Sequence, residues 1–138
     1  MVKGVALLDS KEYLELGKLV NSNFENLFNL ELLLNSKYDR VFGYYENDKL
    51  KAFVHVRILY ETLEIINIVV DPSYRRRGIA TLLLEHIKNI DGIKEMILEV
   101  NINNEPALKT YQNFNFKVIS ERKNYYGSDT ALIMKRDV

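Results

Sequence analysis

Apolar residues recur at helical spacing through the N-terminal part of the chain. Asp9 or Ser10 supplies a residue type that caps helices, and the apolar positions after it lie three or four residues apart. These positions are Tyr13, Leu16, Leu19 and Val20, then Phe24, Leu27, Phe28, Leu30, Leu32, Leu33 and Leu34. We expect two helical stretches here, preceded by a short strand at Val5–Leu8. The second stretch is too apolar for a free surface helix, so it should pack against other elements.

From Val41 onward the pattern changes to the alternation and β-branched runs of strands. The expected strands are Val41–Glu46, Lys51–Tyr60 and Glu64–Val70. Asn47-Asp48 is a turn signal after the first strand, and Asp71-Pro72 ends the third. One face of the second strand carries Ala52, Val54, Val56 and Ile58. These strands should form an antiparallel meander.

Beyond the third strand, helices and strands alternate. A helical stripe of Ile79, Leu83, Ile87 and Ile90 begins at Gly78 and stops at Asp91-Gly92. The remaining elements expected are a strand at Ile93–Val100, a helix opened by Asn104 and Pro106 with Ala107, Leu108 and Tyr111 inward, and strands at Phe116–Arg122 and Thr130–Lys135 around Gly127-Ser128-Asp129. The order α-α-β-β-β-α-β-α-β-β predicts one α/β domain over residues 1–138, a mixed sheet with helices on both faces.

The composition narrows the possible chemistry. The 138 residues contain no cysteine, which excludes a disulfide scaffold, a Cys-ligated zinc site, an iron–sulfur cluster and a thiol nucleophile. His55 and His86 leave little for a His-based metal site, and we assign neither a role. With 19 basic and 19 acidic residues, the chain lacks the strongly basic character of a general nucleic-acid binder. We see no membrane span or signal peptide and expect a cytoplasmic enzyme or binding module.

The segment Val70–Ala80 has the features of an anion site. A strand ends there, a short loop turns, and a helix begins with small residues. Unpaired amides and the helix dipole favour an anion at such an N-terminus, and Arg75–Arg77 add charge and fork-shaped donors. Gly78 and Ala80 let the backbone approach a bulky phosphate. The segment is neither a Walker A loop nor a Gly-x-Gly-x-x-Gly fingerprint. It predicts a pyrophosphate cradle, with a loop of solvated arginines as the alternative.

A second candidate constellation lies farther along the chain. Glu99 stands near the end of an apolar strand, where a carboxylate is costly unless it is paired or faces a site. It could accept a proton through a water molecule, or it could simply pair with a surface Lys or Arg. Tyr111 lies on the apolar stripe of the next helix and is either a core aromatic or part of the same site.

Together these segments resemble one family, the GNAT acetyltransferases, which use acetyl-CoA. The family's Arg/Gln-x-x-Gly-x-Gly/Ala motif matches Arg75, Gly78 and Ala80. The spacing from that motif to Asn104, Ala107 and Tyr111 also agrees. Asn67–Pro72, Leu98–Val100, Arg122–Tyr126 and Ala131–Met134 look like the RimI-type branch, which acetylates protein N-termini, notably of a ribosomal protein. The resemblance covers about Val41 to Lys135 and implies the GNAT fold, whose central sheet is mixed and mostly antiparallel.

The resemblance also implies residue roles. Backbone groups of Ile68, Val69 and Val70 would pair with the pantetheine arm of acetyl-CoA as an added strand, in a splay beside Ile93–Val100. The amides that would hold the pyrophosphate are those of Arg76, Arg77, Gly78, Ile79, Ala80 and Thr81. Asn104 would contact the CoA arm, near Ala107. Glu99 would act as the base and Tyr111, near the thioester sulfur, as the acid, with no metal and no covalent intermediate.

The acceptor half of the resemblance has departures. The first 39 residues match the family poorly, and the connection at Gly127-Ser128-Asp129 is short. Asn115 replaces the usual glycine of a Gly-Phe pair, and asparagine should keep the left-handed turn there.

We expect acetyl transfer to a protein or peptide N-terminal α-amine. A lysine side chain or a small-molecule amine is the alternative acceptor, and a non-catalytic CoA- or RNA-binding module is a further hypothesis. The expected partners are acetyl-CoA and that amine, with no membrane, nucleic acid only through a ribosomal substrate, and a monomer or dimer.

Overall fold

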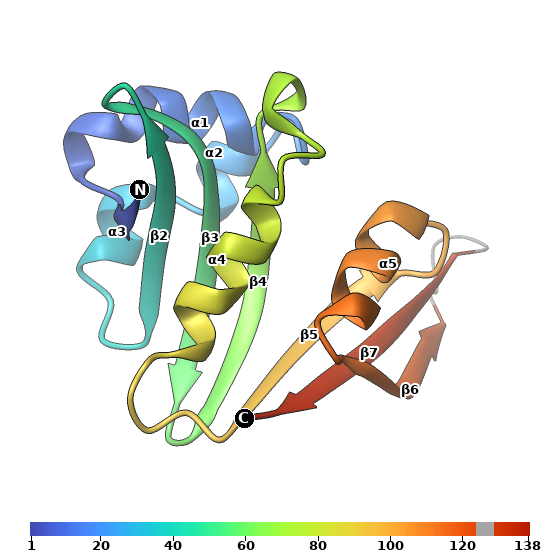
Figure 1. Ribbon diagram of the computed structural model, residues 1–138. Coiled ribbons are helices and arrows are strands. Elements are labelled where there is room, and N and C mark those ends of the chain that lie inside the picture. Colours follow the sequence, from blue (N-terminus) through green and yellow to red (C-terminus); the bar gives the residue numbers. More distant parts are fainter. Residues whose placement is uncertain (124–128) are drawn as a thin grey trace.

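The computed structural model describes residues 1–123 and 129–138 (Figure 1). Its strands are β1 (Val2–Gly4), β2 (Asp39–Glu46), β3 (Lys49–Leu59), β4 (Thr62–Val70), β5 (Glu95–Asn101), β6 (Lys117–Lys123) and β7 (Thr130–Asp137). Its helices are α1 (Ser10–Gly17), α2 (Phe24–Leu27), α3 (Leu30–Leu34), α4 (Ile79–Lys88) and α5 (Glu105–Asn113), with 3-10 turns η1 (Leu7–Asp9) and η2 (Pro72–Tyr74). Residues 124–126 of the family-like segment and 127–128 of the expected final turn lie outside the described residues.

The strands form one mixed sheet, as the sequence predicts. Their order is β1-β2-β3-β4-β5-β7-β6, and every neighbouring pair is antiparallel except β4 and β5. The parallel pair follows from its connection, because α4 carries the chain back to the starting end of the sheet before β5 begins. In Figure 1, α4 and α5 lie in front of the sheet, and α1 to α3 gather behind β2 and β3.

Two apolar clusters, one on each face of the sheet, follow from the alternation along β3. Val54 and Val56 belong to the cluster that packs with α4 and α5. Phe53 belongs to the cluster that packs with α1, α2 and α3, and its ring contacts Tyr13, with centroids 4.7 Å apart. Because successive side chains of a strand point to opposite faces, the predicted alternation places helices on both sides.

The strands β4 and β5 pair over only part of their length. Their register runs from Thr62 opposite Glu95 to Ile65 opposite Leu98 and then stops, although β4 continues to Val70. A bulge at Ile66 interrupts the β3–β4 register at the same level. Figure 1 shows the two strands diverging from this point. The predicted splay is therefore confirmed.

The N-terminal expectations need correction. The strand lies at Val2–Gly4 and not at Val5–Leu8, because the chain leaves the edge of β2 after the Val5 amide donates to the Val41 carbonyl, 2.9 Å away. The second helical stretch is two short helices. Asn29 adopts an extended conformation between them, and its side chain caps α3 by accepting from the Leu32 amide. Local capping by Asn29 outweighs the continuous apolar pattern.

The left-handed turn after α5 is confirmed. Asn115 has φ of 69°, and the Phe116 amide donates to the Tyr111 carbonyl at 3.0 Å. Asparagine tolerates this conformation better than most residues, so the turn survives without the family's glycine.

Candidate active site

The splay leaves one edge of β4 without a strand partner. The Asp71 amide donates to the Lys51 carbonyl on the β3 side, 2.8 Å away. Successive backbone amides of a strand point to opposite edges, so Val70 and Ile68 direct their N–H and C=O groups away from β3, toward the splay. Val69 instead faces β3 and buries its side chain beneath α1. Of the three residues predicted to pair with an extended ligand, Ile68 directs both backbone groups toward the splay, and Val70 directs its amide there while its carbonyl accepts from Arg75 Nε.

The predicted anion cradle lies directly after β4. Gly78 caps α4 with φ of 74°, and Arg76 also has a positive φ, 64°. The first helical bond runs from the Leu82 amide to the Gly78 carbonyl, so the amides of Ile79–Thr81 have no acceptor within the helix. A Cβ at Gly78 would meet no other atom within 4 Å. The turn is therefore open at Gly78, and the helix start carries amides without helical acceptors, as an anion site requires.

The three arginines of this loop have different surroundings. Arg75 donates from Nε to the Val70 carbonyl at 3.4 Å. Arg77 lies 3.7 Å from a Glu46 carboxylate oxygen and over the Tyr74 ring, 4.6 Å from its centroid. Two of the three guanidinium groups thus contact the protein itself, which is unlike a freely solvated basic run.

Glu99 is exposed and paired, the arrangement that the sequence left open as its alternative. Its neighbours Leu98 and Val100 are buried on the α4–α5 face, so Glu99 points to the opposite face. The side chain is 40% exposed, and its Oε1 accepts from Arg122 Nε on β6 at 3.1 Å and from Nη2 of the same residue. The carboxylate raises the pKa of Arg122 through this hydrogen bond and its charge. Arg122 holds Glu99 beside the splay on its open face.

Tyr111 lies on the other face, in the core beneath α5. Only 7% of the residue is exposed, and its ring contacts Phe116 edge to face, 5.8 Å between centroids. Burial raises the pKa of Tyr111 to about 12. The phenol, which is protonated at neutral pH even at its ordinary pKa, therefore keeps its proton to a higher pH. The fold brings Glu99 and Tyr111 to opposite faces of the sheet at β5.

Asn104 and Ala107 are joined by a capping bond at the start of α5. The Asn104 side-chain oxygen accepts from the Ala107 amide, 3.3 Å away. This leaves the Asn104 NH₂ group as the part of its side chain that can donate to a ligand. Pro106 occupies the first turn, where its missing amide costs nothing.

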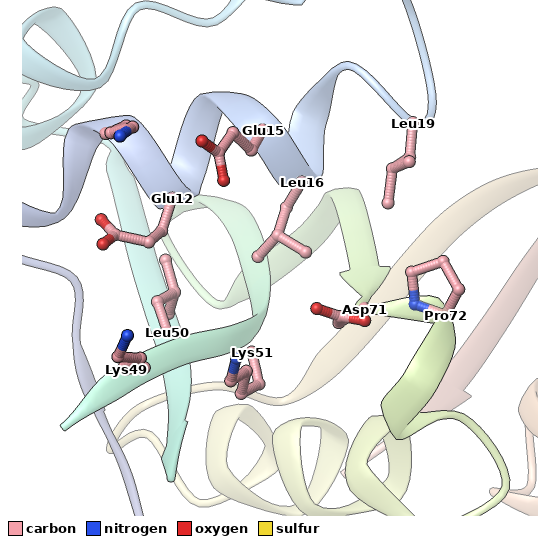
Figure 2. Close-up of a pocket in the computed structure, with 10 residues that line it drawn as sticks. Glu12, Glu15, Leu16, Leu19, Lys49, Leu50, Lys51, Asp71 and Pro72 are labelled. Carbon is pink, nitrogen blue, oxygen red and sulfur yellow. The ribbon is translucent and has the colours of Figure 1, made fainter. Parts of the chain in front are cut away.

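A pocket of about 400 Å³ lies between α1 and the end of β4, next to the predicted site residues (Figure 2). Figure 2 shows Leu16 from α1 and Leu19 from the turn after it directed toward Lys51 on β3 and Pro72, which follows β4. The complete lining is Lys11, Glu12, Glu15, Leu16, Leu19, Lys49, Leu50, Lys51, Asp71 and Pro72. It contains none of the predicted site residues, and its mixed charges show no single ligand preference.

Two further results concern metals and membranes. Within residues 1–123 and 129–138, no three His, Cys, Asp or Glu side chains gather where they could hold a metal ion. In the same part of the chain, no helix combines the length and apolar character needed to cross a membrane.

The structure adds two polar residues that the sequence reading did not assign. Arg122 contacts Glu99, although only the fold brings β6 near β5. Asn67 lies at the start of the splay, opposite His55 on β3. Its signal was present in the sequence, because a single amide interrupts an otherwise β-branched run of isoleucines and valines.

Comparison with known proteins identifies relatives. The chain is 35% identical over 98 residues to the [ribosomal protein bS18]-alanine N-acetyltransferase of Escherichia coli strain K12, covering 64% of this chain and 65% of that protein. It is 40% identical over 77 residues to an N-alpha-acetyltransferase of Saccharolobus solfataricus, covering 52% of this chain and 46% of that one. The matched region thus spans somewhat less than two thirds of the first relative and less than half of the second.

Solved structures agree on the fold. The crystal structure of the ribosomal-protein-S18-alanine N-acetyltransferase from Escherichia coli superposes with a TM-score of 0.79 at 24% identity, covering all of this chain and 93% of the other. The PaiA N-acetyltransferase of Thermoplasma acidophilum in complex with coenzyme A gives 0.83 at 20% identity, covering 100% and 98%. The model of the acetyltransferase (GNAT) family matches residues 10–116. With that match over most of its length, the chain belongs to the GNAT acetyltransferase family.

Proposed function

We propose that this protein transfers the acetyl group of acetyl-CoA directly to a primary amine, and that the acceptor is the N-terminal α-amine of a protein or peptide. One observation carries the proposal. The unpaired edge of β4, at Ile68 and Val70, leads directly into the exposed amides at the start of α4. An extended amide-containing arm and a pyrophosphate, joined in that order, fit this combination of strand edge and helix end.

The neighbouring residues have the chemistry that direct transfer needs. When bound, acetyl-CoA would supply an activated acyl group as a thioester. Glu99 would take the proton from the amine through a water molecule, from the open face of the sheet. Tyr111, whose phenol is protonated at neutral pH, would donate a proton to the departing thiolate from the opposite face. An amide on the free edge of β4 would stabilise the carbonyl oxygen.

The α-amine is the favoured acceptor for two reasons. Its ordinary pKa is about 8, against about 10.4 for lysine, so more of it is neutral and nucleophilic at pH 7. The relatives named above are, by their names, an alanine N-acetyltransferase and an N-alpha-acetyltransferase. A ribosomal protein is the acceptor named for one of them, and contact with nucleic acid would come only through such a substrate. Oligomeric state and a cytoplasmic location stay predictions.

Mass spectrometry with two matched peptides tests the proposal. One peptide has a free α-amine and a blocked lysine, and the other has a blocked N-terminus and a free lysine. Incubated with acetyl-CoA and the protein, the first should be acetylated and the second should not. Acetylation of the lysine alone, or of a small amine far faster than either peptide, would replace the proposed acceptor. Binding of acetyl-CoA without any transfer would favour a non-catalytic module.

A further inference from the structure

Two buried polar atoms lie at directly opposed positions of β3 and β4. In the described part of the chain, His55 Nδ1 and Asn67 Nδ2 are the buried side-chain polar atoms without a hydrogen-bond partner. His55 pairs with Asn67 in the β3–β4 register, so both side chains point to the same face. Leaving such atoms unpaired is unfavourable, so their shared location needs an explanation.

The His55 side of this pair is fixed. Its ring is fully buried, and Nε2 lies 2.6 Å from Asp39 Oδ1. Asp39 also accepts from Ser36 Oγ at 2.6 Å and from Arg57 Nε at 3.4 Å. The carboxylate requires a donor, so the ring proton lies on Nε2 and Nδ1 carries a lone pair. Burial lowers the pKa of His55, which keeps the ring in this neutral form.

The Asn67 amide complements that lone pair. Its NH₂ group donates, so a rotation of the side chain would satisfy both unpaired atoms with one hydrogen bond. Asn67 is partly exposed although Nδ2 is not, so its accessible surface belongs to its other atoms. With the nitrogen directed at His55, the side-chain oxygen points away from the ring.

Asn67 lies where β4 and β5 separate, so its side-chain oxygen is placed near the proposed reaction site. Leu98 and Ile65 form the last β4–β5 pair. Glu99 follows on β5, and Asn67 follows the bulge on β4. By alternation both side chains lie on the face opposite α4 and α5, because Asn67 shares its face with Val69 and Glu99 lies between Leu98 and Val100, which pack on the α4–α5 side. With the Asn67 nitrogen turned to His55, an amide oxygen on β4 and a carboxylate on β5 would stand on the two sides of the opening, on the face away from Tyr111.

We propose that Asn67 binds the amine acceptor, its side-chain oxygen accepting one N–H of the primary amine while Glu99 faces the amine from β5. His55 and Asp39 are positioning residues, because they set which end of the Asn67 amide faces the splay. This assignment rests on the proposed function and adds to it a residue that recognises the nucleophile.

The test compares how one substitution changes the KM for the peptide and the KM for acetyl-CoA. Asn67→Leu keeps the side-chain size and removes both polar ends. We expect the KM for the α-amine peptide to rise about tenfold, the effect of one lost hydrogen bond, while the KM for acetyl-CoA stays within about twofold. Thr62→Val is the matched control. It removes a polar group at the paired end of the same strand, where Thr62 Oγ1 donates to Glu95 at 2.8 Å, and should leave both KM values unchanged.

A second variant tests the positioning role. His55→Leu should raise the peptide KM less than Asn67→Leu does, and the double variant should add little to Asn67→Leu, because both act through one amide. If Asn67→Leu does not fold, Asn67→Ala takes its place, with peptide binding to the CoA-loaded protein measured by calorimetry.

The outcomes separate the two proposals. An unchanged peptide KM in a folded, active Asn67 variant overturns the role of Asn67, and so does an equal loss for both substrates. Absence of acetyl transfer by the wild-type protein to any amine overturns the proposed function, and the assignment of Asn67 with it.

Discussion

At the scale of single residues, Tyr111 is a buried side chain whose phenol is protonated at neutral pH. Replacing it by Phe keeps the ring in the core and its contact with Phe116. We predict that Tyr111→Phe lowers kcat about 10²-fold, the usual contribution of a general acid, with little change in melting temperature. Steady-state kinetics with the α-amine peptide would check this. A kcat equal to that of the wild type would remove Tyr111 from the chemistry and leave it a core residue.

For Glu99 we predict an effect on proton removal, because this carboxylate is exposed and paired with Arg122 on the open face of the sheet. Glu99→Gln keeps the shape and the hydrogen bond from Arg122 but removes the basic oxygen. Its kcat/KM should fall about 10²-fold. Glu95→Gln is the control, since Glu95 lies on the same face of β5 at its paired end and bonds Lys135 at 3.0 Å. A similar loss in both variants would indicate a general charge effect in place of a base.

At the scale of elements, the start of α4 depends on Gly78 for its backbone and for its open space. Gly78→Ala should destabilise the protein by about 1 kcal/mol, because alanine is strained at positive φ. Gly92→Ala offers a matched control. Gly92 has φ of 84°, equally open surroundings and a place after α4, far along the chain from the cradle.

Comparing Gly78→Ala with Gly92→Ala should distinguish the cost of backbone strain from the loss of acetyl-CoA binding. Both variants should lose similar stability in urea unfolding, and Gly78→Ala alone should weaken acetyl-CoA binding in calorimetry, since only its Cβ enters the space beside the free amides. Equal affinity in the two variants would contradict the cradle.

Elements with a strong local signal were predictable, and those that depend on distant contacts were not. A few neighbouring residues are enough to predict the helix that begins at Ile79 and the left-handed turn at Asn115, and both are confirmed. The N-terminal strand was misplaced because β1 forms by edge pairing with β2, which the apolar pattern of Val5–Leu8 does not report. The splay was expected only from the family resemblance, and the sequence did not reveal that the bulge at Ile66 accompanies it.

The residues of the candidate site also differ in how far the sequence predicts their surroundings. The backbone geometry of the proposed cradle, a left-handed Gly78 before α4, follows from local sequence and was predictable, while the binding of pyrophosphate there stays a prediction. The partners of Glu99 and His55 come from β6 and β2, and a linear pattern does not show which side chains such pairing brings together. The exposure of Glu99 likewise depends on which face of β5 the helices cover.

At the scale of the whole molecule, stability should depend on pH through His55. Burial lowers its pKa in the folded protein below the ordinary 6.5. Between the two pKa values the unfolded chain binds more protons, so stability is complete above about pH 7.5 and is lost as pH falls from 6.5 through the folded pKa. Urea unfolding between about pH 5 and pH 8 should show this slope.

A variant isolates the contribution of His55. His55→Gln can still donate to Asp39 but does not titrate, so its slope over this range should be smaller. The lowered pKa of Asp39 acts separately, below its ordinary value of 3.8: burial raises that pKa, and the contacts with Ser36, His55 and Arg57 outweigh the effect. Identical slopes in the wild type and the variant would contradict the neutral, buried His55.

The central claim is that the free edge of β4 receives acetyl-CoA as an added strand. Amide hydrogen exchange, resolved by residue with and without acetyl-CoA, measures this directly. In the free protein the amides of Ile68 and Val70 should exchange quickly, while those of Val69 and Asp71, which face β3, should be protected. Acetyl-CoA should protect Ile68 and Val70 selectively. Unchanged exchange at both residues under saturating acetyl-CoA would contradict the account.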